Sequence, residues 1–147
     1  MTSVAQVLKT KPDNTVFTVA AGDSVYDAIK LMADKQIGAL VVTDGDAIVG
    51  IVTERDYARK VVLMERSSKM TPVRDIMSHA VRFVRPEQTT EECMAIMTDR
   101  RMRHLPVIDK ERLVGMVSIG DLVKNIIAEQ QFTIQMLEQY ITGERPL

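Results

Sequence analysis

The chain has 147 residues, the length of about one domain, and it carries 19 Lys and Arg against 20 Asp and Glu. Hydrophobic residues make up 46% and charged residues 27%, a balance typical of a globular protein. The net charge of −1 gives no field that would attract nucleic acid or an anionic membrane. We therefore expect neither nucleic acid nor a membrane among the partners.

Cysteine and histidine are too scarce for a disulfide framework or a metal site. The single cysteine, Cys93, excludes an intrachain disulfide, and two histidines, His79 and His104, leave little for a metal. The N-terminal residues contain no apolar or Arg-rich segment typical of an export signal. No unbroken apolar stretch approaches the length of a membrane helix. The expected compartment is a reducing one, the cytoplasm.

The sequence repeats itself with a period of 65 residues. Residues 19–57 align with residues 84–122 without a gap, and ten of these 39 positions are identical. Chance would give about one identity in twenty positions, so we interpret the chain as a tandem duplication. The identical pairs are Val19/Val84, Met32/Met97, Asp34/Asp99, Leu40/Leu105, Val42/Val107, Asp44/Asp109, Val49/Val114, Gly50/Gly115, Val52/Val117 and Asp56/Asp121.

Both copies predict the element order β-α-β-β-α. Ser24 is the expected N-cap of the first helix, and Asp27 three residues later completes a capping box. Thr89 and Glu92 repeat this pattern in the second copy. An Asp-Gly pair between two apolar runs predicts a hairpin at residues 44–46. The predicted strands are 16–19, 39–43 and 47–52, then 81–84, 104–108 and 112–117, and the second helix of each copy begins at Thr53 and at Ser118.

Changes in composition divide the chain into four parts. Residues 65–71 are polar and lack periodicity, which indicates a linker. Short helical segments at residues 4–8 and 73–77 are expected to lead into the first and the second copy. The predicted parts are a first repeat with its lead-in at 1–64, a linker at 65–72, a second repeat at 73–128 and a helical extension at 129–147.

The extension continues the last helix without proline or glycine from Asp121 to Thr142. Its apolar residues follow the spacing of an amphipathic helix whose far part has no repeat to pack on. We expect residues 132–141 to contact a second subunit or another partner. The apolar positions are Leu122, Ile126, Ile127, Phe132, Met136, Leu137, Tyr140 and Ile141.

A short motif recurs where the last strand of each copy ends. It reads Gly-Ile-Val-Thr-Glu-Arg-Asp at residues 50–56 and Gly-Met-Val-Ser-Ile-Gly-Asp at residues 115–121. Together with Arg-His-Leu-Pro-Val-Ile-Asp at residues 103–109, this doubled pattern resembles the cystathionine-β-synthase (CBS) domain family over about residues 4–128. The resemblance is to a tandem CBS pair, or Bateman module, in a stand-alone signal-transduction protein of bacterial type.

The resemblance implies a fold of the α/β (α+β) class. Two β-α-β-β-α repeats would pack by pseudo-two-fold symmetry, followed by an extended C-terminal helix. Modules of this family commonly dimerise, so a homodimer is expected. They bind adenosine-containing ligands in clefts between the repeats, namely AMP, ADP, ATP, NAD or S-adenosylmethionine. For this chain AMP is the first choice, with NAD or ATP as further candidates.

Thr53 and Asp56, with their counterparts Ser118 and Asp121, fit this ligand class chemically. One carboxylate can accept both ribose O–H bonds, and a helix N-terminus supplies free N–H groups and a favourable dipole for phosphate. The alternative is an ordinary capping box, in which the aspartate bonds the amide of the N-cap residue. Because the motif occurs twice, each time with a glycine three residues before the hydroxyl, we favour the ligand-binding interpretation.

The resemblance also implies an adenine slot between the first strand of a copy and the segment that enters its second strand. Arg55 and Arg103 are further phosphate candidates, with a solvated surface charge as the alternative for each. Pro106 must lie where the strand ladder needs no N–H. The slot residues are Val16, Ile37, Gly38 and Ala39 in the first copy and Val81, Met102, Arg103, His104, Leu105 and Pro106 in the second.

The sequence contains no pattern that indicates catalysis or metal binding. Cys93 aligns with Ala28 in an apolar helical stripe, so we expect a core side chain rather than a nucleophile. We expect a regulatory protein and not an enzyme, in which nucleotide occupancy changes a repeat or subunit interface that a regulated protein reads. The alternative is a structural homodimerisation module with vestigial ligand sites.

Overall fold

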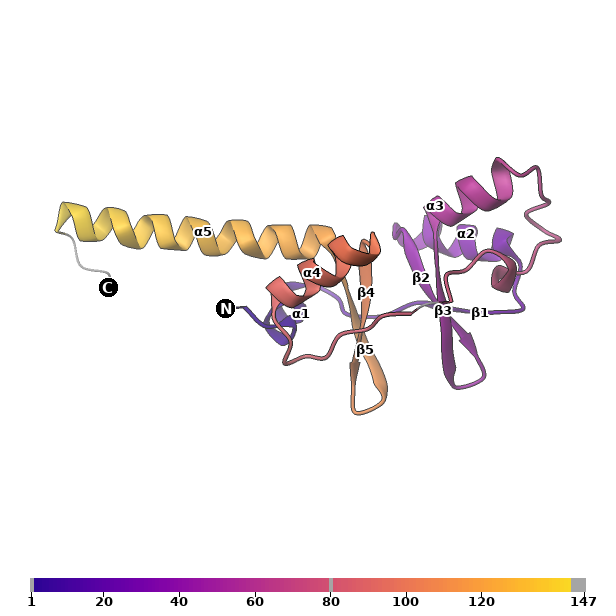
Figure 1. The fold of residues 1–147 in the computed structure, drawn as a ribbon, viewed down its shortest axis with the longest axis horizontal. Coiled ribbons are helices and arrows are strands. Elements are labelled where there is room, and N and C mark those ends of the chain that lie inside the picture. The colour runs from indigo at the N-terminus through magenta and orange to yellow at the C-terminus, as the bar shows by residue number, and fades with distance from the viewer. Residues whose placement is uncertain (1, 80, 144–147) are drawn as a thin grey trace. The chain divides into compact units, whose positions relative to one another are not determined.

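The computed structural model describes residues 2–79 and 81–143 of the chain. Its helices and strands fall into two units (Figure 1). The middle unit is Thr15–Phe83, and the terminal unit combines Met1–Asn14 with Val84–Leu147. Each unit is a small sheet with helices packed on it, and a long helix ends the described chain. The predicted mixed α/β class with two repeats and an extended C-terminal helix is confirmed.

The middle unit is built on a three-stranded sheet of order β1-β2-β3. β1 pairs parallel with β2, and β2 pairs antiparallel with β3 across a turn in which Gly45 has a φ of +60°. This left-handed conformation explains the glycine in the turn. The elements are β1 (Thr18–Ala20), α2 (Val25–Lys35), β2 (Ala39–Asp44), β3 (Ala47–Thr53), α3 (Glu54–Tyr57), the π-helix η1 (Ala58–Val62) and the 3₁₀ turn η2 (Val73–Asp75).

The terminal unit is built on an antiparallel pair of strands, β4 and β5. The N-terminal helix α1 packs against β5 and α5, and α4 packs against β4 and α5. The elements are α1 (Val4–Thr10), α4 (Thr90–Arg100), β4 (His104–Asp109), β5 (Arg112–Ser118) and α5 (Ile119–Thr142). The four hairpin strands of the two units all start where predicted, and each ends one residue later.

The strand predicted at residues 81–84 does not form. Only Val84 pairs, as an isolated parallel bridge to Val107. The Val84 N–H donates to the Pro106 carbonyl at 2.9 Å, and the Val84 carbonyl accepts from the Ile108 N–H at 2.9 Å. The next upstream bond would need an N–H at position 106, which proline lacks. Pro106 therefore stops the pairing, whereas in the middle unit β1 forms, two residues later than predicted.

The predicted N-caps are confirmed, but the capping boxes predicted with them are incomplete. The Ser24 hydroxyl accepts from the Asp27 N–H at 3.1 Å, and the Thr89 hydroxyl accepts from the Glu92 N–H at 3.2 Å. The Glu92 carboxylate accepts from the Gln88 side-chain amide at 3.0 Å instead of returning to the backbone. Complete capping boxes form at the N-caps Ser3, Thr53 and Ser118.

Each lead-in segment packs in the unit built from the other repeat. Helix α1, predicted to lead into the first copy, contributes three buried side chains to the core of the terminal unit. The Val4 N–H donates to the Gln88 carbonyl at 2.8 Å. The segment predicted to lead into the second copy packs in the middle unit, where the Val73 N–H donates to the Asp23 carbonyl at 2.8 Å. Each lead-in segment thus belongs to the unit of the other repeat. The predicted boundaries of the repeats along the sequence stay a prediction.

A separate apolar core fills each unit. Met32 and Leu40 are fully buried in the middle unit, and Leu105 and Leu122 in the terminal unit. Cys93 lies in the terminal core at 0% exposure, and burial raises the pKa of its thiol to about 11. The expectation of a core cysteine rather than a nucleophile agrees with this environment.

Helix α5 extends well beyond the other elements of its unit (Figure 1). Leu122 in its first turns is buried, whereas Ile127 to Gly143 are exposed except for the half-buried Gln139. The predicted helix from Asp121 to Thr142 is confirmed, and the last residues of the predicted extension, 144–147, lie outside the described residues. No described helix combines the length and the apolar content that a membrane crossing requires.

Candidate functional site

In each unit the last strand runs directly into a helix, and the residue at the junction carries a hydroxyl. Thr53 ends β3 and caps α3, and Ser118 ends β5 and caps α5. Asp56 and Asp121 follow on the first turn of each helix. We call these junctions the Thr53 site and the Ser118 site.

In the Thr53 site the hydroxyl and the carboxylate hold the start of α3. Thr53 Oγ1 accepts from the Asp56 N–H at 3.1 Å. Asp56 Oδ2 accepts from the Thr53 N–H at 3.0 Å and from the Thr53 hydroxyl at 3.1 Å. Lys60 Nζ lies 3.3 Å from Asp56 Oδ1 and donates to the Ile76 carbonyl at 2.9 Å. The Asp56 side chain is 18% exposed, so a ligand can still reach it.

The Ser118 site repeats this arrangement with a lysine from a different element. Ser118 Oγ accepts from the Asp121 N–H at 3.1 Å, and Asp121 Oδ2 accepts from the Ser118 N–H at 2.9 Å. Lys11, which follows α1, places Nζ 3.1 Å from Asp121 Oδ2 and donates to the Met116 carbonyl at 2.7 Å. The Asp121 side chain is 21% exposed.

The capping box left open as an alternative is therefore present at both sites. It does not use up either carboxylate, because a carboxylate offers about four lone-pair positions. The contacts above occupy three at Asp56 and two at Asp121. Each aspartate keeps acceptor capacity for a ribose hydroxyl.

In the middle unit the predicted slot segment lies against the start of α3. The Glu54 N–H donates to the Gly38 carbonyl at 3.1 Å, and Ala39 is the sheet partner of Thr53. Ile37 and Gly38 are half-buried, and Ala39 is buried. The fold thus brings these three predicted slot residues together with the Thr53 site.

The terminal unit places its slot segment in the same way. The Ile119 N–H donates to the Arg103 carbonyl at 2.9 Å, and His104 is the sheet partner of Ser118. The Arg103 side chain is exposed, and His104 is half-buried. The remaining slot residues are the half-buried Met102 and the buried Leu105 and Pro106.

The side chains of four predicted residues are less closely tied to the two sites. Arg55 and Arg103 are exposed, and no ion pair links either guanidinium to another described residue, so phosphate binding and solvation both remain open. Val16 is half-buried in the segment before β1. Val81 is half-buried in the middle unit, whereas the rest of its predicted slot lies in the terminal unit. The roles of both valines stay predictions.

The glycine of each motif accommodates a lead-in segment. A Cβ at Gly50 would lie 2.7 Å from the Ser78 carbonyl oxygen and from Met77 Sδ. A Cβ at Gly115 would lie 2.9 Å from Leu8 Cδ2. At both glycines the chain itself therefore makes the close approach that a Cβ would prevent.

Lys11 and Lys60 are the site residues that sequence reasoning missed. Lys60 stands four residues after Asp56, a helical spacing that could have indicated the pair. Lys11 lies more than a hundred residues before Asp121, so no local pattern points to it. Each ammonium puts a cation beside the aspartate, which suits a ligand carrying phosphate. Residues 2–79 and 81–143 contain no group of three or more His, Cys, Asp or Glu side chains that could hold a metal ion.

Comparison with known proteins gives consistent results. The family model for the CBS domain matches residues 4–63 and 73–128. The curated protein CBSX3, mitochondrial, of Arabidopsis thaliana, described as CBS domain-containing, is 42% identical over 150 residues, covering 97% of this chain and 73% of that protein. The solved structure of a protein with CBS domains from Burkholderia ambifaria MC40-6 is 67% identical with a TM-score of 0.84, covering 90% of this chain and 99% of that chain.

A more distant structure contains bound ligands. It is the CBS domain pair of protein MJ0100 in complex with 5′-methylthioadenosine and S-adenosyl-L-methionine. It is 21% identical with a TM-score of 0.76, covering 88% of this chain and 98% of that chain. At this identity the likeness shows the fold.

Proposed function

The chain belongs to the CBS domain family as a pair of repeats, and on this premise we propose that it is a regulatory sensor that binds an adenosine nucleotide at the Thr53 and Ser118 sites. It performs no catalysis of its own. Nucleotide occupancy alters an interface of the repeats or subunits, and a regulated protein responds to that change.

One observation carries the proposal, namely the same polar arrangement in both units. A partly exposed aspartate stands on the first turn of a helix, beside a lysine and beside the segment that enters a strand. Arg55 and Gly120 stand at the second position of α3 and α5, so their N–H groups have no acceptor within the helix. Such N–H groups can donate to an anion. The carboxylate suits a ribose diol, and the lysine and amides suit phosphate.

The family and a structural neighbour support the proposed ligand class. The domain pair of MJ0100 binds two molecules that share an adenosine moiety, which supports an adenosine ligand for this chain. Lys11 and Lys60, which lie beside the two aspartates, favour a phosphate-bearing member of that class. AMP is the first candidate, followed by NAD and ATP.

A thermal-shift screen tests this function directly. AMP, ADP, ATP, NAD, NADH and S-adenosylmethionine are compared with uridine monophosphate and inorganic phosphate as controls. A ligand at a hundred times its Kd stabilises the folded state by about 2.7 kcal/mol, which raises the Tm of a chain of this size by about 5–10 °C. An adenine nucleotide that raises the Tm above both controls is the expected result.

The second candidate function is a structural homodimerisation module with vestigial sites. The observation in its favour is that both capping boxes are complete without a ligand. It predicts that no nucleotide in the screen raises the Tm. In either case we propose a homodimer, and the cytoplasm as its compartment, on the sequence evidence given above.

A further inference from the structure

Helix α5 carries a regular apolar row that begins beside the Ser118 site. Its residues follow one another at alternating spacings of four and three, the repeat of a coiled coil. In heptad terms all three a positions are isoleucine, and the d positions are valine, glutamine and leucine. We call this row the α5 seam, and it consists of Val123, Ile127, Gln130, Ile134, Leu137 and Ile141.

The α5 seam is distinct from the face that anchors the helix to its own unit. Leu122 is buried and Ile126 is half-buried, so these two residues face the terminal unit. Val123 and Ile127, in the same turns, are 43% and 49% exposed. The seam therefore stays uncovered where α5 still packs on its unit as well as beyond it.

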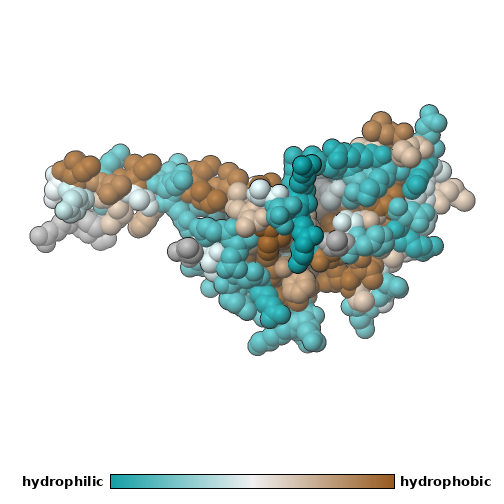
Figure 2. All heavy atoms as spheres, viewed as in Figure 1, coloured by the Kyte–Doolittle hydropathy of each residue, from teal (hydrophilic) through white to brown (hydrophobic). Residues whose placement is uncertain are grey.

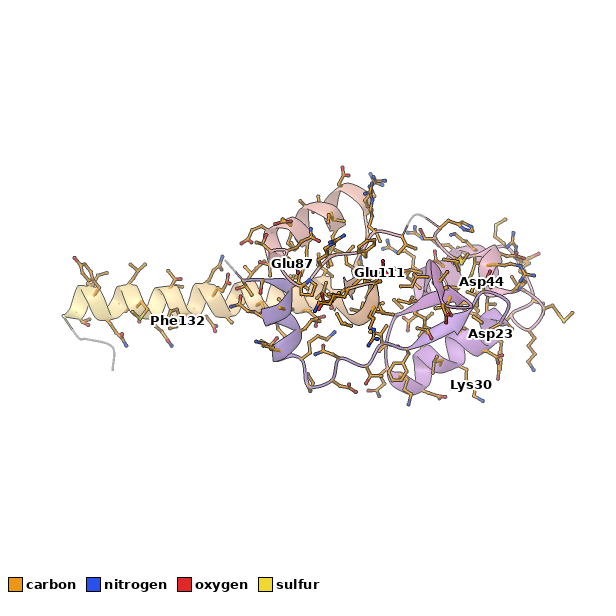
Figure 3. All side chains as sticks on the ribbon, turned by 90° about the horizontal axis from the view of Figure 1, so that it is seen from below. Asp23, Lys30, Asp44, Glu87, Glu111 and Phe132 are labelled. Atoms are coloured by element: carbon orange, nitrogen blue, oxygen red, sulfur yellow. The ribbon has the colours of Figure 1, made fainter. Side chains whose placement is uncertain are left out.

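Beyond its unit the helix presents apolar side chains to solvent. Exposure rises from 53% at Ile134 to 80% at Ile141. Figure 2 shows apolar surface gathered along α5, and Figure 3 shows Phe132 on the part that projects beyond the other elements of its unit. Since apolar rows of this length are rarely left exposed on a stable helix, this one calls for a covering surface.

We propose that a second copy of this chain covers the α5 seam, with the two α5 helices paired parallel and in register as a two-stranded coiled coil. β-Branched residues at a favour two parallel strands when leucine stands at d, and this chain has isoleucine at all three a positions and Leu137 at one of its d positions. The d position Gln130 then faces its own copy, where the two side-chain amides can hydrogen-bond to each other, whereas a shifted register sets each amide against an apolar residue.

The charges beside the α5 seam are compatible with pairing between identical helices. The e positions are Lys124, Gln131 and Glu138, and the g positions are Ile126, Thr133 and Tyr140. Because no g position is charged, no like charges meet across a parallel pair. The flanking side chains therefore do not oppose a two-fold contact between identical helices.

The pairing would join the dimer contact to the Ser118 site through one helix. Asp121 lies on the first turn of α5, and the seam begins two residues later at Val123. A ligand that shifts the start of α5 therefore acts on the contact between subunits. This last consequence rests on the proposed function, whereas the pairing itself does not.

Disulfide cross-linking of the full chain tests the pairing. Gln130→Cys and Leu137→Cys are made separately and oxidised at micromolar concentration without nucleotide. Both d residues face their own copies at once only in a parallel, in-register pair, so most chains of both variants should run as linked dimers on a non-reducing gel. An antiparallel pair can bring at most one of the two positions opposite itself.

Two controls show whether the cross-links depend on the α5 seam and on the orientation of the two helices. Phe132→Cys places an exposed thiol outside the α5 seam and should link only a few chains, and the wild type, whose Cys93 is buried, should link none. A mixture of Val123→Cys and Ile141→Cys reports antiparallel pairing. Linked dimers in that mixture overturn the proposal, and so does failure of both d variants to link while circular dichroism shows them folded. Nucleotide binding by the same variants, measured by thermal shift, tests the proposed function separately.

Discussion

Asp56 and Asp121 hold the starts of two helices by contacts that lie wholly within the chain. Loss of an N-cap interaction costs about 0.5–2 kcal/mol, and a partly exposed ion pair adds about 0–1 kcal/mol. Replacing either aspartate therefore lowers stability even in the absence of a ligand. Stability alone cannot separate a capping role from a binding role, so the affinity for nucleotide has to be measured beside it.

Removing Lys11 and removing Lys60 should lower the stability by different amounts. Lys11 is 25% exposed and donates to the Met116 carbonyl at 2.7 Å, whereas Lys60 is half exposed. Lys11→Met leaves a half-buried carbonyl unpaired, and we expect it to lower the free energy of unfolding by about 1–2 kcal/mol. Lys60→Met should cost under about 1 kcal/mol. Urea unfolding of both variants checks the order, and a larger loss at Lys60 would contradict it.

Burial of Cys93 makes stability depend on pH in the alkaline range. The pKa of its thiol is raised from 9.0 to about 11, so the folded state favours the neutral thiol. The stabilisation is complete below pH 9 and is lost as the pH rises through 11. Two pKa units correspond to roughly 2–3 kcal/mol.

Cys93→Ala, which copies Ala28 of the first repeat, is the reference for this effect. Between pH 8 and 11 the wild type should lose more stability than Cys93→Ala in chemical denaturation. Parallel curves for the two proteins would show that the thiol does not contribute.

At the scale of elements, the glycines before each hydroxyl decide how closely a lead-in segment packs on the last strand. Gly50 faces the Ser78 carbonyl, which is fixed because the backbones of Ser78 and Ile51 exchange two hydrogen bonds. Gly115 faces the end of the Leu8 side chain, which can rotate. The same motif position is therefore tighter in the middle unit than in the terminal unit.

Alanine substitutions measure this difference. Gly50→Ala should destabilise the chain by about 1–3 kcal/mol because backbone must move, and Gly115→Ala by less. Gly120→Ala is the matched control, since a Cβ there meets nothing closer than the Ser118 hydroxyl at 3.6 Å and alanine favours the helix. Thermal melts of the three variants should rank them in this order of destabilisation, and equal losses at all three would contradict the packing argument.

Most elements were predictable because their signals are local. The hairpin strands follow from apolar runs around a turn, and the N-caps from a hydroxyl before a helical stripe. The missing strand at residues 81–84 depends on Pro106, more than twenty residues away, and the packing of α1 depends on partners more than eighty residues away. Pairing at such distance leaves no periodic signal in the sequence.

In the candidate site, too, local motifs were predictable and distant contacts were not. Thr53, Asp56, Ser118 and Asp121 were found because the motif is repeated, and the fold places them at equivalent junctions. The capping boxes at both junctions were the alternative that the motif left open, and both are complete. The pairing of Asp121 with Lys11 could not be predicted, because it is a contact from the far end of the chain.

At the scale of the whole molecule, the account predicts a dimer in solution that depends on the α5 seam. Light scattering should give twice the chain mass of 16.5 kDa at micromolar concentration. Ile134→Glu with Leu137→Glu should weaken the dimer, since each buried apolar side chain contributes roughly 1.5–3 kcal/mol. Ala128→Glu with Gln135→Glu adds the same charge at exposed positions on the opposite side of the helix and should leave the mass unchanged. A monomeric wild type, or equal effects of both pairs, would contradict this prediction.

The capping box of α1 lies outside both proposed binding sites, so it supplies the control for a test of those sites. In α1, Gln6 Oε1 accepts from the Ser3 N–H at 2.8 Å, and the Ser3 hydroxyl accepts from the Gln6 N–H at 3.2 Å. Gln6→Ala therefore removes a contact of the same kind as Asp56→Ala and Asp121→Ala. All three variants should lose stability, and only the two aspartate variants should lose affinity for nucleotide.

Calorimetric titration of AMP into the wild type and these three variants is the most direct measurement. The account predicts that Asp56→Ala and Asp121→Ala each weaken one site about ten- to a hundred-fold, the loss of a charged hydrogen bond worth about 1.5–3 kcal/mol, while Gln6→Ala binds as the wild type does. Removing the 2′-hydroxyl of the nucleotide should also weaken binding to the wild type, because one hydrogen bond from the ribose to the aspartate is lost. If both aspartate variants bind AMP with wild-type affinity while their stability falls, the aspartates only cap their helices and the sensor account is contradicted.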